Sequence, residues 1–125
     1  MGELNKNIIQ LVGMLITVMN KYGKEGAIME TGYSTYSDIL GHGRDEQERF
    51  VNTALPIIKS KVSTQNINNP DNRILLCCWY ELYDANTGGG GYFEYHFGIL
   101  ETGSAMKEAY DNLQIRIGEF YGVVG

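Results

Sequence analysis

The stretch from Arg73 to Glu101 constrains the fold of this chain most, because it contains two aromatic-rich segments separated by a run of four glycines. In the second segment apolar residues alternate with polar ones, which is the two-residue period of a half-buried strand. The first segment is apolar on both faces, which is typical of a strand covered on both sides. The pattern predicts a β-hairpin over 73–101 with 86–91 as its connecting loop.

Charge and packing favour one register of this hairpin. Glu81 directly opposite Glu94 would place two carboxylates about 5 Å apart, which is unfavourable. A shift by two residues places Glu81 opposite His96 and gives an ion pair instead. The same shift covers Gly98 with the ring of Trp79. We therefore expect Glu81 and His96 to lie side by side on the outer face of the hairpin.

Two segments before the hairpin carry the three- and four-residue spacing of amphipathic helices. The first spans about residues 3–22 and is apolar over more than half of its circumference, which indicates burial on two sides or an oligomer contact. The second begins after Gly43 and contains Pro56, which should bend this helix or end it near Leu55.

A last helix follows the hairpin, where Thr102 or Ser104 can cap its first turn. A short strand is expected around 27–30. With 125 residues the chain is near the commonest size of one domain. The elements predict a single α+β domain over residues 1–125, in which a small antiparallel sheet centred on the hairpin packs against an N-terminal, a second and a C-terminal helix.

The net charge and the two cysteines indicate which partners and which cellular compartment the chain favours. A net charge of −5 without a run of Lys or Arg disfavours binding to extended nucleic acid and would attract a basic protein. Cys77 and Cys78 are adjacent in a predicted strand, so their side chains point to opposite faces and cannot join. Free thiols favour a reducing cytoplasm. The apolar run near the N-terminus is too short to span a bilayer, and we expect no membrane association.

The outer face of the predicted hairpin combines aromatic rings with ionisable groups, which is typical of binding surfaces. The same face could instead be covered by one of the helices, because both strands are apolar on both sides. With nearby cations included, the candidate partner- or ligand-binding residues are Trp79, Glu81, Tyr83, Tyr92, Glu94, His96, Arg44 and Arg73.

Catalytic and metal chemistry have weaker support in the sequence. Glu81 and His96 could form the acid/base pair of a hydrolase, but no nucleophile motif accompanies them. His42, Glu46, Glu94 and His96 offer metal-binding groups without the paired spacing of a metal site. We expect neither a catalytic residue, nor a metal site, nor a cofactor.

These patterns favour a noncatalytic cytoplasmic interaction or inhibitor protein of the immunity or anti-defence type. It would act as a homo-oligomer, most simply a homodimer, and present an acidic, aromatic surface to a macromolecular partner. The alternative is a protein that binds a nucleotide or cyclic nucleotide on the outer face of the hairpin, with its aromatic rings stacking on the base. A hydrolase that uses Glu81 and His96 comes third.

Overall fold

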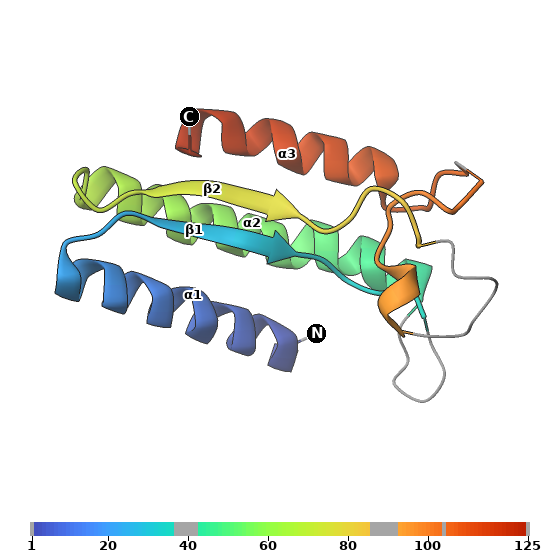
Figure 1. Cartoon of the computed structure of the whole chain (residues 1–125), viewed down its shortest axis with the longest axis horizontal. Coiled ribbons are helices and arrows are strands. Elements are labelled where there is room, and N and C mark those ends of the chain that lie inside the picture. Colours follow the sequence, from blue (N-terminus) through green and yellow to red (C-terminus); the bar gives the residue numbers. More distant parts are fainter. Residues whose placement is uncertain (1, 37–42, 86–92, 104, 125) are drawn as a thin grey trace.

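The computed structural model describes residues 2–36, 43–85, 93–103 and 105–124, and these form an α+β fold (Figure 1). In Figure 1 the two strands lie in front of the central helix, and the first and last helices lie on either side of it. The elements are α1 (Gly2–Tyr22), β1 (Gly26–Thr31), α2 (Arg44–Asn68), β2 (Ile74–Trp79), the short 3-10 helix η1 (Phe93–His96) and α3 (Tyr110–Val124).

The sheet is parallel, so the prediction of an antiparallel hairpin is wrong. β2 pairs with β1, with Ala27 beside Leu76 and Ile28 beside Cys77. The helix α2 joins these strands and brings the chain back to the start of the sheet, as a parallel connection requires. The aromatic segment expected to be the second hairpin strand instead contains η1 and the residues after it.

The segments 81–85 and 95–100 do meet, but not as a hairpin. The Glu81 amide donates to the Phe97 carbonyl, and the Asp84 amide donates to the Leu100 carbonyl, so both segments advance in the same direction. Gly98 lies so close to the backbone of Tyr83 and Asp84 that a Cβ atom would collide there. This close approach holds the two segments in an irregular arrangement, and the predicted register is absent.

In the described part of the chain the α-helices agree with the sequence prediction in number and differ from it in their ends. The first helix and the short strand after it are confirmed. Pro56 does not end α2, because the helix buries an apolar stripe on both sides of it, and burial outweighs the lost hydrogen bond. α3 begins at Tyr110, later than predicted, because the backbone amides of Glu101 and Lys107 first donate to the carbonyls of Ala105 and Ile99 in an irregular segment.

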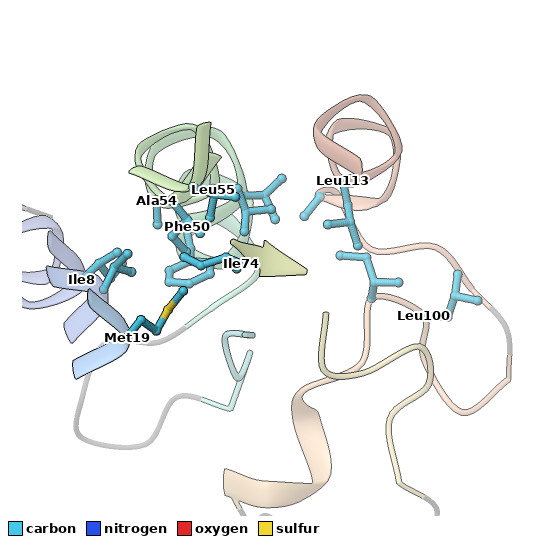
Figure 2. Close-up of a cluster of buried hydrophobic side chains, with 14 residues drawn as sticks. Ile8, Met19, Phe50, Ala54, Leu55, Ile74, Leu100 and Leu113 are labelled. Atoms are coloured by element: carbon cyan, nitrogen blue, oxygen red, sulfur yellow. The ribbon is translucent and has the colours of Figure 1, made fainter. Parts of the chain in front are cut away.

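The apolar core forms where the helices meet the sheet, with α2 at its centre (Figure 2). Val51, Val62 and Ile74 are completely buried there. The buried apolar side chains are Ile8, Val12, Met19, Phe50, Val51, Ala54, Leu55, Ile58, Val62, Ile74, Ile99, Leu100, Ala109 and Leu113.

The two cysteines test the orientation of β2. Cys77 packs against the core and its thiol lies 3.9 Å from the Thr31 hydroxyl, whereas the neighbouring Cys78 points to the other face. Burial raises the pKa of the Cys77 thiol, which lowers its thiolate fraction. We expect Cys78 to react faster than Cys77 with a disulfide reagent at pH 8. The Cys77→Ser variant, which retains Cys78, should therefore react faster than the Cys78→Ser variant, which retains Cys77. Equal rates in the two variants would contradict this orientation.

Candidate functional site

The sheet face opposite α2 is open, since no element of the described chain crosses over it in Figure 1. Ile28 and Cys77 pack against the core, so their strand neighbours Met29 and Leu76 point to the open face, where they are 65% and 42% exposed. Parallel sheets are normally covered on both faces. An uncovered apolar face on a parallel sheet is therefore unusual for a domain that has no binding partner.

A groove of about 390 Å³ adjoins this sheet, between α1 and β1. The side chains of Leu11 and Leu15 on α1 line one wall, β1 forms the other, and Phe50 and Ile58 of α2 lie beneath. The lining is mostly apolar, with Glu30 and Thr31 as its polar side chains. Its size and character are those of sites that bind small molecules or single side chains.

A buried polar cluster lies at the carboxyl ends of the strands, centred on Lys107. The Lys107 Nζ atom lies 2.7 Å from Asp84 Oδ1, 2.9 Å from Thr35 Oγ1 and 3.4 Å from the His96 carbonyl oxygen. Its side chain is 1% exposed. Burial lowers the pKa of Lys107, and the nearby Asp84 opposes this effect without cancelling it. Because its three protons have three acceptors, Lys107 holds segments together and is not poised for chemistry.

His96 belongs to the rim of this cluster. Its Nδ1 atom lies 3.9 Å from Asp84 Oδ2, and its ring stacks on Tyr36 with centroids 5.4 Å apart. Asp84 is therefore an acidic neighbour of His96, in the place where the hairpin register predicted Glu81. Glu81 instead makes backbone hydrogen bonds to Phe97 and Ile99.

The other predicted site residues are dispersed. The indole N–H of Trp79 donates to the Glu81 carbonyl at 3.1 Å, and its ring lies 6.3 Å from that of Phe50, so Trp79 packs against the core. Tyr83 is 45% exposed. Arg44, at the start of α2, forms ion pairs with Glu101 and Glu108.

The remaining three candidates do not complete an aromatic face. Arg73 precedes β2 and lies at the opposite end of the parallel sheet from Arg44. Glu94 falls in η1, and Tyr92 lies outside the described residues. For metal binding, the described ranges contain no group of three or more His, Cys, Asp or Glu that could hold an ion.

Sequence reasoning missed the open sheet face and the groove. The signal for the groove was present in the first helix, whose apolar surface is wider than one neighbour can cover. It leaves Leu11 65% exposed beside β1. No comparable signal existed for the open sheet face, because it depends on β1 and β2 being partners.

Comparison of the chain with protein-family models, with curated proteins and with solved structures gave no match. Among the described residues, no helix has the length and apolar character needed to cross a membrane.

Proposed function

We propose that the chain is a noncatalytic cytoplasmic interaction or inhibitor protein, of the immunity or anti-defence kind, that binds a macromolecular partner. The open apolar face of its parallel sheet carries this proposal. Met29 and Leu76 project from two neighbouring strands, and burying one fully exposed side chain of this kind is worth about 1.5–3 kcal/mol. A partner that covers this face would gain part of that free energy, because these side chains are already about half buried.

The net charge and the hydrogen bonding of the buried polar groups support the same proposal. The net charge of −5 would attract a basic partner over distances of about 10 Å at moderate salt. The Lys107 cluster uses its hydrogen-bonding groups on itself. Arg44 already faces two carboxylates, which weakens the case for a nucleotide phosphate at this position.

The experiment compares partner capture by two double variants of matched chemistry. Met29→Glu with Leu76→Glu adds two charges to the open face, and Met106→Glu with Ile115→Glu adds two charges to other exposed positions. From a lysate of the cells in which the protein occurs, we expect the wild type and the second variant to retain the same proteins. The sheet-face variant should retain at least tenfold less of them.

Circular dichroism of both variants checks that the fold survives, since all four positions are exposed. If the folded sheet-face variant captured the same proteins in the same amounts as the wild type, the open face would not be the interaction surface.

A further inference from the structure

The two-stranded sheet is narrower than the layer of three helices beneath it and cannot cover all of them. Packed helices lie 8–10 Å apart, so α1, α2 and α3 side by side span roughly 16–20 Å between their outer axes. Two strands span only about 5 Å. In Figure 1, α1 lies on one side of α2 and α3 lies on the other. β1 is the strand nearer to α1, and no further strand covers the part of α1 that extends past the outer edge of β1. The exposed Leu11 lies on this side and lines the groove.

β1 also has an unpaired edge next to the groove. In the described part of the chain β1 pairs only with β2, so the backbone groups on its other edge have no strand partner. Such an edge is a template for another extended chain. The groove begins where this edge lies, because Ala27, Ile28 and Glu30 are among its lining residues.

We propose that an extended peptide segment of the partner adds to the outer edge of β1 as a third strand and fills the groove. This inference rests on the proposed function and names the part of the partner that binds. Strand addition obtains its affinity from backbone hydrogen bonds and its specificity from pockets for alternate side chains. Here the pocket has Phe50 and Ile58 at its base, so it accepts an apolar side chain.

Charge specifies a second feature of the peptide. Glu30 is exposed and lies in the groove lining beside the unpaired edge, and the groove contains no Lys or Arg. A basic side chain on the peptide would lie near this carboxylate and benefit from the net negative charge of the chain. The segment therefore alternates apolar residues with polar or basic ones.

A second copy of the chain fits this site less well than a single strand. α1 forms the far wall of the groove, beyond the edge of β1. Edge-to-edge pairing of two copies of β1 would bring the α1 and α2 of each copy against the α1 of the other. An isolated extended segment has no helices attached and avoids this collision.

The probe is a fluorescein-labelled peptide of sequence Lys-Val-Thr-Ile-Thr-Val-Lys, and binding to the full chain is measured by fluorescence anisotropy. Two further peptides carry N-methyl groups on alternate amides, either at the even or at the odd positions. Alternate amides of an extended chain point to opposite edges, so only one of these peptides should lose affinity, by more than tenfold. Equal affinity of the two methylated peptides, or no binding of the parent peptide, would overturn the proposal.

Protein variants locate the binding site. We expect Leu11→Glu to weaken peptide binding at least tenfold and Ile115→Glu, a similarly exposed position on α3, to leave it unchanged. Glu30→Lys should weaken binding in the same way and favour a peptide with Glu in place of Lys. Glu25→Lys makes the same change in charge at an exposed position outside the groove and serves as its control.

Two outcomes separate this inference from the proposed function. If the peptide fails to bind while the sheet-face variant still loses the captured partner, strand addition is wrong and the proposed function stands. If sedimentation shows a dimer that Leu11→Glu dissociates, the groove is occupied by a second copy, and the peptide proposal is overturned.

Discussion

Replacing Lys107 with Met is expected to lower the free energy of unfolding by about 3–5 kcal/mol at pH 7. The side chain of Asp84 is only 10% exposed, and the substitution leaves its charge without the ammonium group 2.7 Å away. Thr35 and the His96 carbonyl lose a donor at the same time. Urea denaturation followed by circular dichroism measures the change.

The matched control combines Lys107→Met with Asp84→Asn. Asn keeps an oxygen that can accept the Gly98 amide hydrogen bond, and the double variant has no uncompensated charge. It should recover most of the loss, which a double-mutant cycle would record as a coupling energy. A loss below about 1 kcal/mol in the single variant would show that the pair is as weak as an exposed ion pair.

The pH dependence of the difference between wild type and Lys107→Met has a definite sign. Burial lowers the pKa of Lys107 below its ordinary value of 10.5, so in alkaline solution the unfolded chain holds this proton to higher pH than the folded chain does. Stability then rises with pH between the lowered pKa and 10.5. The stability advantage of the wild type should widen over this window. Cys77 and Tyr33 are partly buried and burial raises the pKa of each, but they affect both proteins equally.

Replacing Gly98 with Ala is expected to cost about 3 kcal/mol. A Cβ atom at this position would collide with backbone atoms of Tyr83, Asp84 and Leu100, which cannot turn aside as a flexible side chain can. The crossing of segments 81–85 and 95–100 would have to open, and the Gly98 amide would lose its 2.9 Å hydrogen bond to Asp84.

Gly118→Ala is the control for this substitution. An added Cβ atom meets nothing within 4 Å there, and the position lies inside α3, so this change should stabilise the chain by about 0.5–1 kcal/mol. Thermal unfolding of both variants measures the contrast. Similar melting temperatures for the two variants would show that the chain around Gly98 is not tightly packed.

Local patterns predicted the elements of this fold well and their partners poorly. The spacing of apolar residues reports which face of a segment is buried, and this identified the helices and the strand near 27–30. It does not report which segment lies alongside. The pairing of Ile28 with Cys77 joins residues far apart in the sequence, and nothing between them marks that contact. The glycine run after β2 favoured the prediction that β2 pairs with the next segment of the chain and not with the distant β1.

The candidate site was harder to predict for the same reason. Trp79 and His96 were placed on one face because a hairpin would align them, yet one packs into the core and the other stacks on Tyr36. Lys107 carried no signal at all, because a lysine near a helix start is normally solvated. Its burial depends on Asp84 and Thr35, which the fold brings to it from separate loops.

A sheet of two strands has no interior strand, and this distributes rigidity unevenly over the molecule. A single ladder of hydrogen bonds joins β1 to β2, whereas each helix is held by its own backbone as well as by its neighbours. Local opening therefore needs the least free energy where the fewest such bonds must break. Among the described residues this adaptable backbone adjoins the groove between α1 and β1, and the helices provide the stiff support on which it can adjust.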